Sequence, residues 1–266
     1  MMNRDLRNQV KEWLDQGVVD LFLAYRMLDG HPLPHAFTKD KIEEVEELVT
    51  GPARYPLENL AGRIMAFYPE AVIGLVAREC DQRALNVLAT WNQVGPEKVK
   101  TIPLSCCPSN LKEHSDCTYL EPHVSGACKA ELGFKFGSTT QDAELLSPEV
   151  RFNHWMYEFG KCIKCYGCRN ICPVCFCKEC SLEHPDLVGT GRLPPEIPLF
   201  HIVRAVHMAG RCIDCGLCED ACPAEIPLRL LYRKVNEIVK EVFGYETGTS
   251  PGQSPFQVLG EPRMPA

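Results

Sequence analysis

The chain has 266 residues, of which 45% are hydrophobic and 24% are charged, and its formal net charge is -7. This length and composition are typical of a globular protein with two small domains. A negative charge without a Lys/Arg block argues against a nucleic-acid partner. No secretory signal and no run of about eighteen apolar residues is evident, so we expect a cytoplasmic protein without a membrane span.

The first 104 residues alternate between helix and strand patterns. Helices are predicted over 5–16, 39–49 and 56–67 and after Asp81, which would cap the last one, and strands over 18–25, 71–77 and 99–104. The run 71–77 is apolar throughout, which is typical of a strand buried on both faces. Together with the helix and the strand that follow, it predicts a parallel crossover unit with its functional edge at the carboxyl ends of the strands.

Cysteines fall at this predicted edge. Cys80 follows the first strand of the crossover unit, and Cys106 and Cys107 follow the second. These thiols could have a redox or ligand role. The alternative is that they are buried and inert, since a free cysteine packs as a small hydrophobic side chain. Residues 108–150 are loop-rich and end the first domain, and the isolated Cys117 and Cys128 within them are interpreted as structural.

The second half of the chain contains the spacing C-x2-C-x2-C-x3-C-P twice. The first run consists of Cys162, Cys165, Cys168, Cys172 and Pro173, and the second of Cys212, Cys215, Cys218, Cys222 and Pro223. This is the spacing of two-cluster ferredoxins, in which three thiolates of a run bind one 4Fe-4S cube and the fourth Cys ligates the other cube. The crossed assignment gives one cube to Cys162, Cys165, Cys168 and Cys222, and the other to Cys212, Cys215, Cys218 and Cys172.

Structural zinc and disulfides are the alternatives to this interpretation. Zinc takes four ligands, usually from paired C-x2-C knuckles, so it explains neither the third Cys of each run nor the prolines. Sixteen cysteines without a signal peptide also belong in a reducing compartment, where thiols serve metal or redox chemistry.

Helical patterns flank and separate the two runs. They cover 149–159, 199–209 and 226–243, which favours an α-helical ferredoxin domain. The apolar stripes on the last two are interpreted as core. They contain Ile202, Val203 and Val206, and Leu228, Leu231, Val235, Ile238 and Val242.

A third cysteine group, Cys175, Cys177 and Cys180, lies between the runs. These three thiols can ligate a third 4Fe-4S cube if a fourth ligand comes from Cys80, Cys106 or Cys107. Zinc bound by the same thiolates, or free thiols, are the alternatives.

Three segments carry a resemblance to a known family. Residues 77–85, 161–173 and 200–212 resemble the iron-sulfur beta subunits related to those of formate dehydrogenases and deazaflavin-reducing hydrogenases, and the similarity extends over most of 55–245. The resemblance implies a subunit that relays electrons between a catalytic dehydrogenase and a flavin subunit, often of heterodisulfide-reductase type, in anaerobic metabolism.

Two further functions stay open. The family's larger members bind a flavin and reduce the deazaflavin themselves, so FAD binding with reduction of an external acceptor is the main alternative. The lack of a G-x-G-x-x-G segment after a strand weighs against it. A stand-alone electron carrier would not need the long N-terminal region. The sequence therefore favours a non-catalytic electron-transfer subunit without deciding whether the chain is an enzyme.

The expected fold is α+β. It consists of an α/β domain over 1–150, an α-helical two-cluster ferredoxin domain over 151–245, and an extended tail over 246–266 that is rich in Gly and Pro. The tail carries Phe256, Val258 and Leu259. These apolar side chains predict either a docking arm for a partner subunit or a segment that folds back on the cluster domain.

Overall fold

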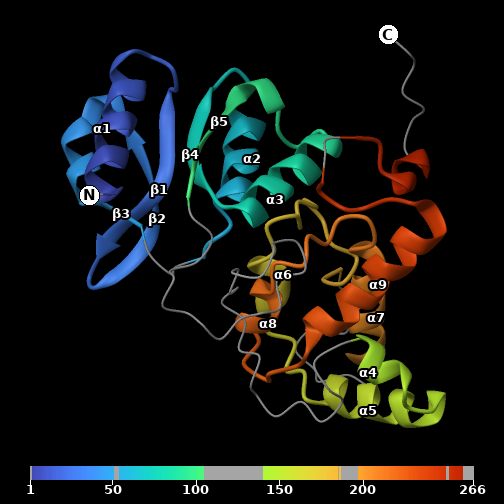
Figure 1. The fold of residues 1–266 in the computed structure, drawn as a ribbon. Helices are drawn as coiled ribbons and strands as arrows, with labels where there is room; N and C mark the ends of the chain where they lie inside the picture. Colours follow the sequence, from blue (N-terminus) through green and yellow to red (C-terminus); the bar gives the residue numbers. More distant parts are fainter. Residues whose placement is uncertain are drawn as a thin grey trace. The chain divides into compact units, whose positions relative to one another are not determined.

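The computed structural model describes residues 2–50, 54–104, 140–184, 186, 197–249 and 252–259. The chain forms two compact units. The first consists of Met1–Lys112 with Gly248–Gly252, and the second of Glu113–Thr247 with Gln253–Ala266. The first unit holds the sheet and the second holds helices and cysteine motifs (Figure 1). The α+β class is therefore confirmed, while the domain boundaries expected at 150 and 245 stay a prediction.

A single mixed sheet organises the first unit. Its strands are β1 (Leu21–Leu28), β2 (His31–Thr38), β3 (Leu48–Val49), β4 (Ile73–Ala77) and β5 (Val99–Pro103). The order is β2-β1-β4-β5, and β3 pairs with β1. β1, β4 and β5 run parallel, whereas β2 and β3 are antiparallel to β1. Every residue of β4 is buried, which confirms the strand covered on both faces.

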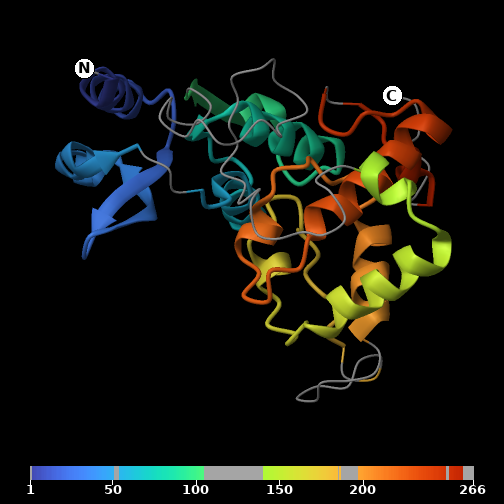
Figure 2. The same cartoon turned by 60° about the horizontal axis from the view of Figure 1, so that its bottom comes forward.

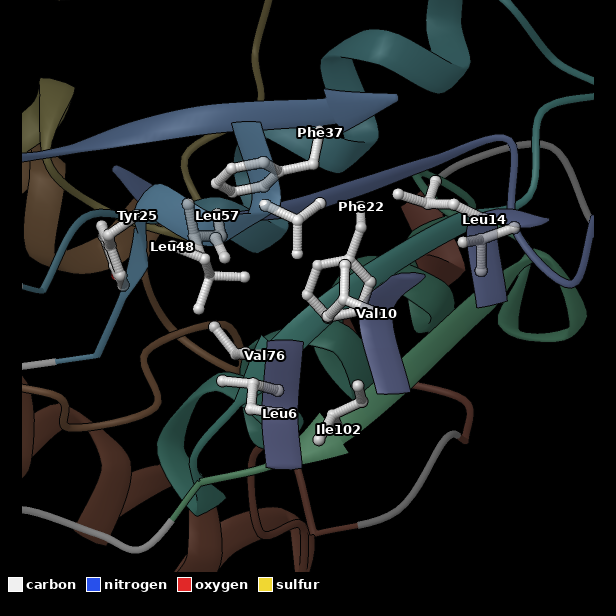
Figure 3. Packing of buried hydrophobic residues seen from close by; sticks show 13 residues of the cluster. Leu6, Val10, Leu14, Phe22, Tyr25, Phe37, Leu48, Leu57, Val76 and Ile102 are labelled. Carbon is white, nitrogen blue, oxygen red and sulfur yellow. The ribbon is translucent and has the colours of Figure 1, made fainter. Parts of the chain in front are cut away.

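Helices cover both faces of this sheet. They are α1 (Met2–Asp15), α2 (Leu57–Phe67) and α3 (Glu79–Thr90), with the 3-10 helices η1 (Lys39–Glu47) and η2 (Pro96–Lys98). α1 lies on one side of the sheet, and α2 and α3 lie on the other (Figure 1). Apolar side chains of α1 pack against Phe22 of β1 and Ile102 of β5 (Figure 3). α3 connects the parallel strands β4 and β5, so the predicted crossover unit is confirmed.

Two strands, β2 and the short β3, were not predicted. β2 pairs with β1 through a two-residue turn in which Asp29 and Gly30 have φ of 50° and 80°. Asp-Gly between two strands is a strong hairpin signal, because both central residues of such a turn need positive φ. The two prolines of β2, Pro32 and Pro34, argue against a strand at 31–38, since proline is tolerated in a strand only at an edge. β2 is such an edge strand.

Two predictions about helices were wrong in detail. The segment 39–49 is a 3-10 helix interrupted at Lys41, where φ is -130° and ψ is 44°, and its last two residues form β3. Asp81 lies in the first turn of α3 and does not precede it. Its carboxylate accepts a hydrogen bond from the backbone N–H of Arg78 at 2.8 Å, so it caps the helix from inside.

The second unit is helical. Its helices are α4 (Thr140–Glu144), α5 (Pro148–Gly160), α6 (Gly167–Asn170), α7 (Ile197–His207), α8 (Leu217–Asp220) and α9 (Leu228–Phe243), followed by the 3-10 helix η3 (Pro255–Leu259). α5 packs beside α7, the short α6 packs beside α8, and α9 contacts both α7 and α8 (Figures 1 and 2). Within the ranges given above, no helix has the length and apolar character needed to cross a membrane.

The apolar stripes predicted on α7 and α9 were partly wrong. On α7, Ile202 and Val206 are 46% and 65% exposed, and the buried face carries His201 and Arg204 instead. On α9, Ile238 and Val242 are likewise exposed, while Tyr232 and Val239 are buried. Polar side chains therefore occupy positions that hydrophobic periodicity assigns to solvent.

Part of the tail folds back on the second unit. The ring centroid of Phe256 lies 5.3 Å from that of Phe243 at the end of α9. A Cβ atom added to Gly210 would come within 2.6 Å of the Phe256 ring, so this glycine, whose φ is +66°, makes room for it. The tail therefore packs on the chain's own helices at this point. The side chains of Val258 and Leu259 lie outside the described part.

Candidate iron-sulfur centres

The two cysteine runs fold into loops of matching backbone geometry. In the first loop, Lys164 and Tyr166 have φ of 52° and 58°. In the second, Asp214 and Gly216 occupy the same positions with φ of 54° and 80°. A short helix follows in each case, α6 or α8. Left-handed residues at alternate positions turn the chain tightly, which brings the cysteines of a C-x2-C-x2-C run to one side of the loop.

The first cavity is lined by four of the predicted ligands. Cys162, Cys165 and Cys168 come from the first loop, and Cys222 comes from the end of the second. The cavity has a volume of about 330 Å³, including space open to solvent, and Phe200 and His201 of α7 complete its wall. The sequence assigned these four cysteines to one cube, and the structure places them around one space.

The second cavity has the complementary set. Cys212, Cys215 and Cys218 come from the second loop, and Cys172 comes from the end of the first. This cavity has a volume of about 380 Å³, including space open to solvent, and Arg204 of α7 and Tyr232 of α9 also line it. Each loop thus contributes three cysteines to its own cavity and one to the other.

The two loops approach each other closely, which allows each to contribute a cysteine to the other's cavity. A Cβ atom on Gly167, the first residue of α6, would lie 3.0 Å from the backbone oxygen of Ala221. That distance is shorter than nearly all real Cβ contacts, so glycine allows the two loops to approach each other here. Ala221 directly precedes Cys222, and the contact therefore helps to bring Cys222 to the first cavity.

Burial disfavours free thiolates at the second cavity. Burial raises the pKa of the Cys172, Cys212 and Cys218 thiols, and the nearby charge of Asp214 adds to the effect at Cys212. Thiolates in such places need a bound cation to stabilise them.

Backbone amides already point at two sulfur atoms. The N–H groups of Lys164 and Gly167 donate to Cys162 Sγ and Cys165 Sγ over 3.3 and 3.5 Å. Hydrogen bonds of this kind favour thiolate over thiol and are common around iron-sulfur clusters.

Among the described residues, no three His, Cys, Asp or Glu side chains are arranged to hold a single metal ion. The ligands of a cube lie farther apart than those of one ion, because each of the four binds a different iron atom. Cysteines spaced around a cavity match that wider arrangement. None of the twelve described cysteines is in a disulfide bond.

Buried charges surround the second cavity. Asp214 accepts hydrogen bonds from Arg229 Nε at 2.7 Å and Arg233 Nε at 2.9 Å, both from α9. Arg204 donates through Nη2 to the backbone oxygen of Cys168 at 2.9 Å, while it also lines the second cavity. Arg204 thereby links the backbone of one loop to the cavity of the other.

Two polar side chains of the cavity walls were missed from the sequence. His201 and Tyr232 are 1% and 3% exposed. Neither ring nitrogen of His201 has a hydrogen-bond partner among the described residues. The hydroxyl of Tyr232 has none there either. Burial, and then the charge of Arg204, lowers the pKa of His201 to about 4. No motif marks either residue, and only the three-dimensional fold brings them to the cavities.

The third cysteine group stays a prediction. Cys175 Sγ lies 3.7 Å from Arg204 Nη1, and Cys177 Sγ lies 3.9 Å from Arg211 Nη1, whereas Cys180 is half-buried. In the first unit, Cys80 Sγ accepts from Arg54 Nη2 at 3.7 Å. Cys106 and Cys107, the other proposed sources of a fourth ligand, lie outside the described residues, as do Cys117 and Cys128.

Comparisons with known proteins agree with this site. Residues 205–227 match the family model of the 4Fe-4S binding domain, which spans the second cysteine run. The chain is 42% identical over 102 residues to the "F420-dependent formate dehydrogenase subunit beta" of Methanocaldococcus jannaschii, covering 38% of this chain and 27% of that protein. It is 33% identical over 186 residues to the "F420-dependent formate dehydrogenase 1 subunit beta" of Methanococcus maripaludis, covering 64% and 48%.

The chain thus spans less than half the length of each of these two relatives. The resemblance expected from the cysteine runs and their flanking segments is nevertheless confirmed. The chain thus carries a 4Fe-4S binding domain and is similar, over part of its length, to the beta subunits of F420-dependent formate dehydrogenases.

Proposed function

We propose that this chain is an electron-transfer subunit that holds two 4Fe-4S cubes, and a third on Cys175, Cys177 and Cys180. It relays electrons between a catalytic dehydrogenase and a flavin or heterodisulfide-reductase-type subunit. One observation carries the proposal: each of two cavities is lined by three cysteines of one run and the fourth cysteine of the other. The cubes supply reversible electron uptake at potentials that their surroundings set.

Residues of the chain would hold the two cubes and keep them close enough for electron transfer between them. The thiolates hold the iron, and the amides of Lys164 and Gly167 stabilise their charge. The neighbouring helices α6 and α8 keep the two cavities next to each other within one unit. An electron that enters one of these two cubes therefore has the other within the same unit.

The identity of the two relatives supports the choice of partners. Both are beta subunits of formate dehydrogenases. We therefore propose a complex in which another chain oxidises the substrate and this chain carries the electrons onward. Identification of the proteins that co-purify under anaerobic conditions tests this part directly. Purification as a single chain under conditions that retain all iron would contradict it.

Four single substitutions test the crossed ligand sets. We expect Cys162→Ser and Cys222→Ser to remove the same electron paramagnetic resonance signal from the reduced protein. Cys212→Ser and Cys172→Ser should both remove the other signal. If Cys172→Ser instead matches Cys162→Ser, each run binds its own cube and the crossed sets are wrong.

Iron and sulfide analysis tests the third cube. With four irons per cube, anaerobically purified protein should contain about twelve irons per chain, and Cys177→Ser should retain about eight. About eight irons in the unaltered chain, with or without one zinc, would overturn the third cube and leave the other two.

A flavin-binding beta subunit is the second candidate. An open cavity of the first unit, with about 1000 Å³ of empty space, is lined by Arg54, Tyr55 and His31 among others. A cation beside an aromatic ring suits a planar, negatively charged cofactor. Extractable FAD, or flavin absorbance that remains after the iron is removed, would favour this candidate.

A further inference from the structure

Each cavity has one buried polar side chain in its wall whose polar atoms have no protein partner within the described part of the chain. His201 belongs to the first cavity and Tyr232 to the second. A buried hydroxyl or ring N–H without a hydrogen bond is destabilising, so such groups normally have a partner. The two residues have in common that each borders a cavity lined by four cysteines.

The His201 ring is held in a fixed orientation. It stacks on Phe159 of α5 with a centroid distance of 4.8 Å and an interplanar angle of 15°. The ring of Phe200 meets it at 5.1 Å and 89°. Aromatic contacts on its face and at its side leave the ring little freedom to turn, and its nitrogens lie in the ring plane, away from the stacked face.

Tyr232 has the corresponding position at the second cavity. It lies in the second turn of α9, next to Arg229 and Arg233. Both arginines donate to Asp214 in the loop of the second cysteine run. Its side chain is buried and lines the cavity together with the four cysteines of the second set. A phenol at this place has one O–H to donate.

We propose that His201 donates a hydrogen bond to a sulfur atom of the cube in the first cavity, and that Tyr232 does the same in the second cavity. Each residue thereby sets the reduction potential of one cube independently of the other. This inference rests on the proposed function, because it requires both cubes.

The direction of the effect follows from charge. Reduction adds a negative charge to the cube, so a donated hydrogen bond stabilises the reduced form more than the oxidised form and raises the potential. A neutral imidazole has one N–H in either tautomer, and a buried tyrosine keeps its O–H, so each residue can donate once. Neither interaction adds net charge to the cavity.

Two substitutions serve as controls for each other. His201→Phe keeps an aromatic ring, and Tyr232→Phe removes only the hydroxyl. In a redox titration of the full-length protein, followed by electron paramagnetic resonance, we expect each variant to lower one midpoint potential, and the two variants to affect different ones. The expected size is a severalfold to tenfold loss in the equilibrium constant for reduction, where tenfold corresponds to about 59 mV for one electron.

Further variants separate hydrogen bonding from packing. His201→Gln retains an N–H donor and should restore part of the potential lost in His201→Phe. His207→Gln changes an exposed residue of the same helix and should leave both potentials unchanged. Equal potentials in His201→Phe and the unaltered protein would overturn the inference for the first cavity, and the same result for Tyr232→Phe would overturn it for the second.

A measurement on the unaltered protein applies even if the His201 variants do not fold. Protein labelled with ¹⁵N-histidine should show a ¹⁵N hyperfine coupling to one reduced cube in pulsed electron paramagnetic resonance. The lack of such a coupling in protein with two reduced cubes would overturn the role of His201 alone. Protein that shows no reduced cubes at all would overturn the proposed function itself.

Discussion

Glu58 is a carboxyl group of α2 with only 2% exposure. Burial, and then the charge of Asp81, raises its pKa well above the usual value of 4.5, although Arg54 and Arg78 act in the opposite direction. A carboxyl group whose pKa is raised by folding stabilises the protein fully below its unfolded pKa. That stabilisation is lost as the pH rises through the folded pKa.

Replacement of Glu58 by Gln should therefore stabilise the protein increasingly as the pH rises. We expect the midpoint of thermal unfolding, followed by circular dichroism under anaerobic conditions, to differ more between variant and unaltered protein at pH 8.5 than near the usual pKa of 4.5. Glu43→Gln, at an exposed position, controls for the loss of a carboxylate. A constant difference across this range would show that Glu58 does not titrate with folding in the stated direction.

Asp214 is the centre of a buried ion-pair group with Arg229 and Arg233. Asp214→Asn leaves two arginines beside an uncharged amide, and breaking a buried pair in this way costs about 3–5 kcal/mol. We expect a clear loss of thermal stability and earlier release of iron on heating. Glu246→Gln, which removes the exposed pair with Lys240, should cost about 1 kcal/mol or less. Similar losses in both variants would contradict the buried character of the Asp214 group.

At the scale of elements, Gly74 shows how closely β1 and β4 are packed. A Cβ atom at this position would lie 2.3 Å from Cδ2 of Phe22 on the neighbouring strand. Gly74→Ala should destabilise the protein by about 1–3 kcal/mol through overpacking, as measured by denaturant unfolding.

Gly62 in α2 is the matched control for Gly74. The nearest atom to an added Cβ there is at 3.5 Å, an ordinary contact. Gly62→Ala should therefore stabilise the protein by about 0.5–1 kcal/mol, because alanine favours helix. An equal effect of both substitutions would mean that the strands can move apart to accept the methyl group.

The elements also show which parts of the fold were predictable from the sequence. β4 was predicted correctly, because a run of seven apolar residues is a local signal. The 3-10 helix at 39–47 was not, because its apolar spacing also fits an α-helix, and the backbone break at Lys41 has no signal in the sequence.

The buried face of α7 was predicted wrongly for a different reason. Hydrophobic periodicity assumes that the interior is apolar, whereas the interior next to the cavities contains His201 and Arg204. The two sets of four cysteines could be predicted, since the ligand spacing is a property of the sequence. The residues that complete the cavity walls could not, because no ligand spacing marks them and only the packing of α7 and α9 brings them to the cavities.

At the scale of the whole molecule, the tail contributes to both units. In the first unit, Asn86 Nδ2 donates to the backbone oxygen of Gly248 at 3.0 Å, and the N–H of Gly252 donates to Thr90 Oγ1 at 3.3 Å. In the second unit, Phe256 packs on Phe243 and over Gly210.

Truncation after Phe243 should therefore destabilise both units. We expect two changes in the truncated protein: a lower midpoint of thermal unfolding, and faster hydrogen exchange in α3 as well as in α9. Substitution of Phe256 by Ala should reproduce only the effect on α9. Unchanged exchange in α3 after truncation would show that Gly248–Gly252 contributes nothing to the first unit.

The path of the tail has a practical consequence for anyone who wishes to divide the protein. The chain passes from the first unit to the second after Lys112, returns at Gly248, and leaves again after Gly252. No single cut therefore yields two complete pieces. A recombinant fragment that ends at Lys112 lacks a short segment of its own fold, and that segment would have to be supplied as a fused or separate peptide.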